Sequence, residues 1–375
     1  MKKRPIAALL SLILIFPLLT AGAPPALAQE ALPALTLFLG FIPNIQFAPV
    51  YVALEKGYFA EEAGVSVTLE YGDETVGVER LATNDLQFAL ISGEQVILAR
   101  AGGRPLVYVF EWYQQFPVGI AAPISTGIET AADLAGHVVG IPGRFGASYT
   151  GLRALLAAVG LREDDIQLEE IGFNAPAMIC AERVEAAVVY IVNEPVQIAD
   201  QCGDVNVIPI APLADLVANG LVTNEETIAD QPALVRGMVA ALARGLADVI
   251  TDPDEAMRIS RHYVETLPQG GSRVAVSIAA ADALRALRAA AESGEPLTPE
   301  AAAELADSLA AVLDPGEVMQ MRVLQNSIAL WQAPRPGYTE AESWEVTMQA
   351  LIEAGLLAEP IDLSGAYTNA FLPES

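Results

Sequence analysis

The chain has 375 residues, of which 53% are hydrophobic and 18% charged, and this balance is typical of a globular protein and argues against disorder. Because one ordinary core does not hold a chain of this length, two domains are expected. The formal net charge of −27 excludes nucleic-acid binding, which needs a basic face, and it repels strongly anionic ligands at long range.

Residues 1–28 have the order of a secretory signal peptide. Basic residues at positions 2–4 precede an apolar stretch at 6–19, and Ala26-Leu27-Ala28 is a small-residue cleavage site. We expect cleavage after Ala28 and export to the periplasm or to the extracytoplasmic face of the cell membrane. A retained single membrane anchor is the alternative.

The next segment alternates between strand-like and helix-like stretches, and we assign residues 29–118 to the first part of lobe one. Alternation of this kind predicts an α/β fold with a mainly parallel sheet that helices cover on both faces. The expected strands are Thr36–Phe41, Val65–Tyr71, Leu86–Ile91 and Leu106–Trp112, and the expected helices lie around Ala48–Lys56, Thr75–Ala82 and Glu94–Ala101.

The alternation resumes after Pro123, and we assign residues 119–222 to lobe two. The stretch "GHVVGIPGRFGASYTGLRALLAAVG" predicts a strand, a glycine-rich turn and a helix. Further strands are expected at "IQLEEIGF", "AAVVYIV" and "VNVIPIA", with helices around Pro176–Glu182 and Glu194–Gln201.

The last part of the chain, residues 223–375, is mainly helical and includes an Ala-rich stretch at 275–312. The simplest arrangement returns this part to lobe one. The chain then crosses between the lobes twice, near Phe116–Ile120 and near Asn219–Thr223. Two crossings between two α/β lobes predict a hinge around a cleft.

The residues that follow the expected strands are the candidate ligand-binding residues, because ligands of open α/β sheets bind outside the carboxyl ends of the strands. These positions repeatedly pair an aromatic wall with an amide or carboxylate that can fix a ligand's orientation. Core-edge aromatics and turn-forming amides are the alternative. The candidates are Asn44, Gln46, Phe47, Tyr51, Glu94, Trp112, Tyr113 and Gln115 in lobe one, and Arg144, Ser148, Tyr149, Asn174, Tyr190, Asn193 and Glu194 in lobe two.

The glycine-rich turn "GIPGRFGASYTG" opens a helix, so its backbone N–H groups can meet an anion or another polar group. Simple turn chemistry is the alternative. The turn has neither the Walker lysine nor the GxGxxG spacing, so we do not expect a nucleotide loop.

The cysteines and histidines argue against a metal site. Cys180 and Cys202 are the only two cysteines, and we predict a disulfide between them, with two separate buried thiols as the alternative. His137 and His262 are the only histidines, and no zinc spacing is present. We expect no metal and no cofactor, and the familiar catalytic motifs are missing.

Four stretches carry a resemblance that covers nearly the whole chain after the signal. They are "FIPNIQFAPVYVALEKGYFAEEAGVSVTLEYGD", "LVYVFEWYQQFPVGIAAPISTGIETAADLAGHVVGIPG", "VVYIVNEPVQIA" and "LQNSIALWQAPRPGYTEAESWEVTMQALIEAGLL". Through them the chain resembles the type II solute-binding proteins of ABC importers, in the branch that includes binders of thiamine pyrimidine precursors, riboflavin, nitrate and alkanesulfonates. The resemblance implies a two-lobed periplasmic binding protein-like fold of type II, with the helical C-terminal part on lobe one. It also implies a monomer that delivers a small molecule to an ABC permease with its ATPase.

The composition bears on the ligand. Many aromatics, few cations and an acidic surface favour a neutral or weakly cationic flat heterocycle over an anion. Riboflavin is slightly favoured, because "FGASYTGLRALLAAVGL" and "NGLVTNEETI" resemble the riboflavin-binding subgroup. A thiamine pyrimidine precursor is the first alternative, and nitrate or an alkanesulfonate is the second.

An enzyme is the alternative from another class, since the same branch contains cytosolic pyrimidine synthases. Those enzymes carry a cysteine-rich cluster, a histidine that is consumed and a lysine that holds pyridoxal phosphate. This chain has two dispersed cysteines, and Lys56 is its only lysine after the signal. We therefore expect no enzymatic activity.

Overall fold

The computed structural model describes residues 31–214, 216–268, 298 and 315–373. The predicted signal peptide and most of the Ala-rich stretch at 275–312 lie outside the described residues. Within the described part, no helix is both long enough and apolar enough to span a bilayer.

The first sheet has five strands in the order β2-β1-β3-β10-β4. Strand β1 pairs with β2 and β3 in parallel, whereas β10 runs antiparallel to β3 and β4. All residues of β3, β4 and β10 are buried, so they form the centre of the core. The strands are β1 (Ala34–Leu39), β2 (Ser66–Tyr71), β3 (Phe88–Ser92), β4 (Leu106–Glu111) and β10 (Asn219–Asn224).

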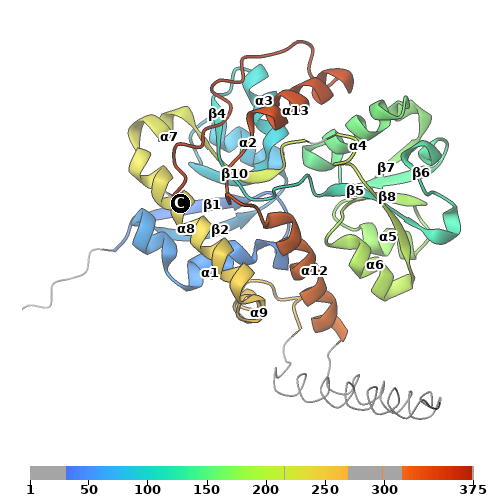
Figure 1. The fold of residues 1–375 in the computed structure, drawn as a ribbon, viewed down its shortest axis with the longest axis horizontal. Coiled ribbons are helices and arrows are strands. Elements are labelled where there is room, and N and C mark those ends of the chain that lie inside the picture. The colour runs from blue at the N-terminus through green and yellow to red at the C-terminus, as the bar shows by residue number, and fades with distance from the viewer. Residues whose placement is uncertain (1–30, 215, 269–297, 299–314, 374–375) are drawn as a thin grey trace, which may run out of the picture. The chain divides into compact units, whose positions relative to one another are not determined.

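The second sheet, whose strands β5 to β8 are labelled in Figure 1, has the order β7-β6-β8-β5-β9. Strand β6 pairs in parallel with β7 and β8, and β5 runs antiparallel to β8 and β9. The strands are β5 (Val118–Pro123), β6 (Val138–Ile141), β7 (Gln167–Glu170), β8 (Ala186–Tyr190) and β9 (Val205–Pro209).

The expectation of mainly parallel sheets is wrong, since each sheet contains two parallel and two antiparallel pairings. The physical reason lies in β5 and β10. Each of them arrives directly from the other sheet, through the connections Trp112–Pro117 and Ile210–Ala218, without the crossover helix that makes neighbouring strands parallel. From the sequence we expected the chain to cross between the lobes at Phe116–Ile120 and Asn219–Thr223, and these ranges overlap β5 and β10.

The predicted helices are confirmed to within two residues at most ends. A helix follows each strand except β4 and β9, which lead directly into β5 and β10, and the regular elements described after β10 are all helices (Figure 1). The bounds are η1 (Ile45–Phe47), α1 (Ala48–Glu55), η2 (Phe59–Ala63), α2 (Glu74–Ala82), α3 (Gly93–Ala101), η3 (Ile124–Thr126), η4 (Ala131–Leu134), α4 (Gly146–Ala158), η5 (Glu163–Asp165), α5 (Ala175–Cys180), α6 (Glu194–Cys202), α7 (Glu225–Asp230), α8 (Pro232–Thr251), α9 (Pro253–Ser260), α12 (Pro315–Trp331) and α13 (Ala341–Glu353).

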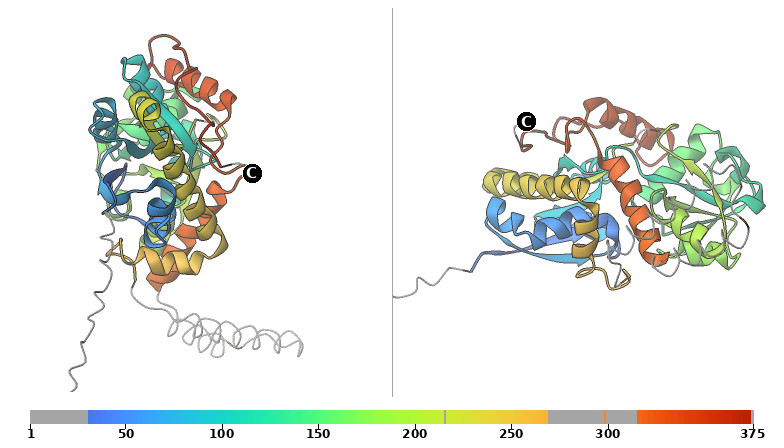
Figure 2. Two further views of the ribbon diagram at one scale, coloured as in Figure 1. Left: turned by 90° about the vertical axis from the view of Figure 1, so that its left-hand side faces the viewer. Right: turned by 60° about the horizontal axis from the view of Figure 1, so that its bottom comes forward.

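The C-terminal helices pack on lobe one, as expected, and some also reach lobe two. Helix α8 packs on α1, and a Cβ at Gly245 would lie 2.2 Å from the Pro49 carbonyl oxygen, so only glycine permits this close approach. Helix α12 contacts α9 and also α6, and α13 contacts α3 and also α4 (Figure 2). Helices α12 and α13 therefore contact helices that flank both sheets.

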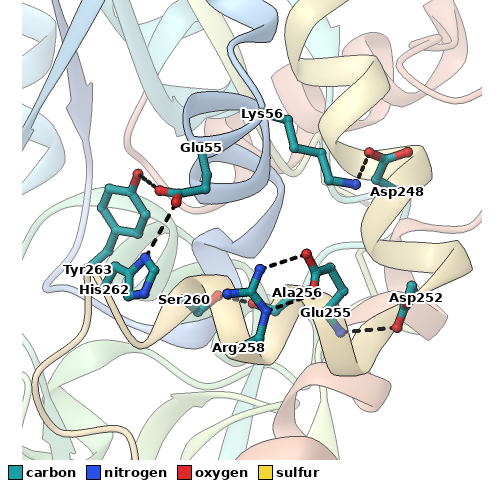
Figure 3. A network of polar contacts seen from close by, with 10 residues as sticks. All are labelled: Glu55, Lys56, Asp248, Asp252, Glu255, Ala256, Arg258, Ser260, His262 and Tyr263. Atoms are coloured by element: carbon teal, nitrogen blue, oxygen red, sulfur yellow. Dashed lines mark hydrogen bonds and ion pairs between the residues drawn. The ribbon is translucent and has the colours of Figure 1, made fainter.

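Ion pairs and hydrogen bonds join the end of α1 to α8 and to the segment that follows α9 (Figure 3). Lys56, directly after α1, places Nζ 2.5 Å from Asp248 Oδ2 on α8, and Tyr263 donates a hydrogen bond of 3.1 Å to Glu55. Both partners of the Lys56 pair are about one-third exposed, so the pair contributes at most about 1 kcal/mol. Lys56 thus has a structural partner in lobe one.

The predicted disulfide is confirmed. Cys180 at the end of α5 is bonded to Cys202 at the end of α6, and 22 residues separate them in the sequence. The bond joins two helices that pack on each other beside the second sheet.

Removing this bond should lower stability, because the disulfide restricts the unfolded chain. For the double variant Cys180→Ser, Cys202→Ser we expect a loss of about 3 kcal/mol in the free energy of unfolding, measured by urea titration. A reducing agent should destabilise the native protein similarly and leave the double variant unchanged. Equal midpoints for the oxidised native protein and the double variant would contradict this expectation.

Candidate functional site

Two adjoining cavities lie where the carboxyl ends of strands from both sheets meet. Gly40 and Phe41, directly after β1, and Tyr190, at the end of β8, line both of them. The first cavity is also lined by Glu74, Phe145, Ala147, Ser148, Phe173 and Glu194. The second is also lined by Gln46, Phe47, Leu90, Trp112, Tyr113 and Asn219.

The cavities are small in this structure, with volumes of about 40 and 30 Å³. Since a water molecule needs about 10–15 Å³ of such space, each cavity has room for only a few waters. The two sheets therefore meet here in a nearly closed arrangement.

Aromatic rings from both sheets form much of the wall. The Phe41 ring, from lobe one, lies 4.7 Å from the Phe173 ring and 6.4 Å from the Tyr190 ring, both from lobe two. The Trp112 ring stacks 5.5 Å from Phe47, and its buried Nε1 has no acceptor among the described residues. The wall thus offers flat apolar faces and one buried donor that is free to bind a ligand.

A buried carboxylate, Glu74 at the start of α2, connects three other elements. Its Oε1 accepts hydrogen bonds from Ser92 N (2.8 Å) and Asn219 Nδ2 (3.0 Å). Its Oε2 lies 2.6 Å from Ser92 Oγ and accepts a hydrogen bond of 3.3 Å from Ala147 N, at the start of α4 in lobe two. One side chain thus ties β3, β10 and α4 together.

Ser92 Oγ also lies 2.6 Å from Oε1 of Glu94, the first carboxylate after β3. A hydroxyl has one hydrogen, so it donates to one carboxyl and must accept from the other. Glu74 already accepts three N–H groups, which favour its ionised form, whereas Oε1 of Glu94 accepts one from Gln95 Nε2 (3.2 Å) and its Oε2 has no partner among the described residues. Glu94 therefore holds the proton, donates to Ser92, and Ser92 donates to Glu74.

The electrostatics agree with this assignment. Burial raises the pKa of Glu94 to about 8, and the neighbouring Glu74 charge raises it as well. Burial raises the pKa of Glu74 to about 7, while the hydrogen bonds from Ser92 and Ala147 oppose that rise. Two buried carboxylates this close do not both ionise readily, so they share one proton near neutral pH.

A second polar link runs across the cavities. Tyr190 donates its hydroxyl hydrogen to Asn219 Oδ1 (3.0 Å), while the amide of the same Asn219 donates to Glu74. Glu194 Oε2 accepts the Tyr190 backbone N–H (2.9 Å), and burial raises the pKa of Glu194 to about 7. Asn219 is therefore held by partners from both lobes.

Seven of the fifteen predicted site residues line the cavities, and eight do not. The lining ones are Gln46, Phe47, Trp112, Tyr113, Ser148, Tyr190 and Glu194. The others are Asn44, Tyr51, Glu94, Gln115, Arg144, Tyr149, Asn174 and Asn193. Glu94 is still linked to the cavity wall, because Ser92 lies between it and Glu74, which lines the first cavity.

Local contacts explain several of the eight. Asn44 accepts the Gln46 backbone N–H (3.0 Å), so it forms a turn. Tyr51 is fully buried and stacks 4.8 Å from Tyr263 in the core. Asn193 accepts a hydrogen bond of 2.7 Å from Gln197 on α6.

Two more of the eight bind glutamates of lobe two outside the cavities. Arg144, 43% exposed, forms ion pairs with Glu163 (3.1 Å) and with Glu170. Tyr149 donates to the same Glu163 (2.8 Å). Gln115 and Asn174 are exposed.

The prediction missed Phe41, Glu74 and Asn219. Phe41 was counted as the last residue of a strand, and Asn219 as part of a crossing. Glu74 had a sequence signal, because it follows β2 and the helix cap Asp73, which accepts the Val76 N–H (3.2 Å). Its position just beyond the end of β2 therefore fits the strand-end rule.

The described part of the chain contains no cluster of three or more His, Cys, Asp or Glu that could hold a metal ion. Lys56, the lysine that a pyridoxal phosphate enzyme would need, is paired with Asp248 and lines neither cavity (Figure 3).

The shared proton makes stability depend on pH. The native protein keeps a proton on Glu94 up to about pH 8, and the unfolded chain releases it near 4.5. Between these values the free energy of unfolding falls as pH rises, by up to about 1.4 kcal/mol per pH unit for one proton. Glu94→Gln keeps a donor towards Ser92 and should remove this part of the slope in urea titrations from pH 5 to 8.

The control is Glu79→Gln, which changes an exposed carboxylate on α2 that pairs with Arg104. In this variant the free energy of unfolding should change with pH as in the native protein. If Glu94→Gln also keeps the native pH dependence, the assignment of the proton to Glu94 is wrong.

Comparison with known proteins places the chain in a family. The model of the family described as NMT1/THI5 like matches residues 44–256. The riboflavin-binding protein RibY of Chloroflexus aurantiacus is 37% identical over 360 residues, which covers 94% of this chain and 90% of that protein. A 4-amino-5-hydroxymethyl-2-methylpyrimidine phosphate synthase of Legionella pneumophila is 27% identical over 229 residues, or 60% of this chain and 72% of the enzyme.

Among solved structures, the periplasmic aliphatic sulphonate binding protein SsuA from Escherichia coli has a TM-score of 0.62 at 16% identity. That match covers 91% of this chain and 94% of the other, so the two share a fold. The predicted two-lobed α/β fold of type II is thereby confirmed, and the chain belongs to the NMT1/THI5 like family.

Proposed function

We propose that this protein is the extracytoplasmic solute-binding subunit of an ABC importer, and that it binds riboflavin between its lobes and delivers it to a permease with its ATPase. The observation that carries the proposal is the wall of aromatic rings from both sheets around one pair of cavities. The identity of 37% to a riboflavin-binding protein over most of the chain supports the choice of ligand.

The chemistry of the wall suits a flat, neutral ring system. Trp112, Tyr190 and Phe41 offer faces for stacking, and such contacts add about 0.5–1.5 kcal/mol beyond burial. The amides of Gln46 and Asn219 can pair with the carbonyl and N–H groups at the polar edge of the ring. An anion, in contrast, would find no Lys or Arg in the lining of either cavity, and Arg144 is paired with Glu163 and Glu170.

Entry of the ligand requires the lobes to separate, since three fused rings do not fit cavities of about 40 and 30 Å³. The two connections Trp112–Pro117 and Ile210–Ala218 are the hinge in this proposal. Lobe one then contains the first sheet, with the chain up to Glu111 and from Asn219 onwards, and lobe two contains the second sheet, from Val118 to Pro209. The bounds expected from the sequence, 118/119 and 222/223, thereby move to the two connections. Ligand contacts made by both lobes would favour the closed state.

A binding role suits the remaining features better than catalysis does. The two cysteines are joined in a disulfide, and Lys56 is engaged by Asp248, so the groups used by the pyrimidine synthases are not free. Disulfides persist in oxidising compartments, which agrees with export and removal of residues 1–28. We propose that the exported protein acts as a monomer.

Calorimetry with riboflavin, a thiamine pyrimidine and taurine tests the ligand. We expect riboflavin to bind, and Tyr190→Ala to weaken its binding about five- to 200-fold, because a stacking face is lost and Asn219, which binds the Tyr190 hydroxyl, loses a partner. Arg144→Ala is the control, and it should bind riboflavin like the native protein, since Arg144 lines neither cavity. Binding of taurine without riboflavin would replace this proposal by an anion binder.

The hinge has a test of its own. Small-angle scattering should show a smaller radius of gyration with saturating riboflavin than without ligand, because closure brings the lobes together. An identical scattering profile with and without bound ligand would argue for a rigid scaffold.

A further inference from the structure

The start of α4 in lobe two is covered by a carboxylate from lobe one. Ala147 N, in the first turn of this 13-residue helix, donates to Glu74 Oε2, and a Cβ at Gly146 would lie 2.5 Å from the same oxygen. Gly146 also has a φ of +61°, which side chains rarely adopt. The positive φ and the short distance restrict position 146 to glycine, and the absence of a side chain there lets the carboxylate approach closely.

A helix start of this kind attracts anions, because its unpaired N–H groups and the helix dipole present positive charge. In this structure the anion is part of the protein. Glu74 is only 3% exposed, yet it lines the first cavity together with Glu194. The proton on Glu94 and the donors around Glu74 keep the negative charge at Glu74, beside the ligand.

We propose that Glu74 is a specificity-determining residue that makes the cleft reject anionic ligands, because its carboxylate occupies the helix start that a phosphate, sulfonate or nitrate would need. The inference rests on the proposed function and deepens it. Applied to flavins, it states that riboflavin is bound and riboflavin 5′-phosphate is rejected.

The electrostatics set the scale of the effect. A phosphate in the closed cleft would face the Glu74 charge in a site with little water, where like charges repel strongly. We therefore expect riboflavin to bind at least about 100-fold more tightly than its phosphate. The ratio of the two affinities is measured by calorimetry at fixed ionic strength.

The decisive variant is Glu74→Gln. Its amide oxygen can still accept from Ser92 N and Asn219, but its amide nitrogen cannot accept from Ala147, so the start of α4 loses its anion. The ratio of the affinity for riboflavin to the affinity for its phosphate should fall at least about tenfold in this variant. Glu79→Gln removes an exposed charge from the same helix, at a residue that lines neither cavity, so it should keep the native preference.

Two results would overturn the inference. One is a native protein that binds riboflavin and its phosphate equally well, which needs no variant and so does not depend on the folding of Glu74→Gln. The other is an unchanged ratio in folded Glu74→Gln, with folding checked by circular dichroism and thermal unfolding.

Failure of the proposed ligand can be told apart from failure of this inference. If the native protein binds neither flavin, the riboflavin proposal fails, and titrations with taurine, nitrate and inorganic phosphate decide the role of Glu74. Binding of one of these anions to Glu74→Gln but not to the native protein supports the inference. Binding to the native protein, or to neither protein, overturns it.

Discussion

The contact on which the rest of the site depends is the buried carboxylate of Glu74. It accepts hydrogen bonds from Ser92 and Asn219 in the first sheet and from Ala147 at the start of α4. If it were removed, donors on three different elements would lose their partner inside a buried site, at a cost of about 1–3 kcal/mol for each. This one group therefore holds the strand ends of lobe one in place and also joins them to lobe two.

The charge at Glu74 is tolerated in the interior because its neighbour Glu94 is neutral. Both carboxyls approach the single hydroxyl of Ser92 at 2.6 Å, and that hydroxyl has only one hydrogen to give. A second negative charge at Glu94 would repel Glu74 in a site with little solvent and leave two acceptors competing for one hydrogen. The Glu74–Glu94 pair thus carries one negative charge, and it lies on the Glu74 carboxylate, which contacts the start of α4.

The sequence predicts the elements well because the alternation of strand and helix is local: Thr36–Phe41 was expected and Ala34–Leu39 is observed. Strand direction is not local, so the antiparallel β5 and β10 were not foreseen. The strand-end rule located Trp112 and Tyr190 correctly on the cavity wall. It does not say which way a side chain points, so Tyr51, which faces Tyr263, was indistinguishable from a wall residue.

One of the antiparallel strands, β10, also links the two connections between the sheets to the cavity wall. Asn219 is the first residue of β10, directly after one connection between the sheets, and its carbonyl oxygen accepts the N–H groups of Trp112 (3.1 Å) and Tyr113 (3.0 Å) in the other connection. Its side chain meanwhile binds Tyr190 of lobe two and Glu74 of lobe one. Because Asn219 contacts both connections and side chains of both lobes, rotation about the hinge that we propose would move or break these contacts and so couple the proposed hinge to the proposed ligand site.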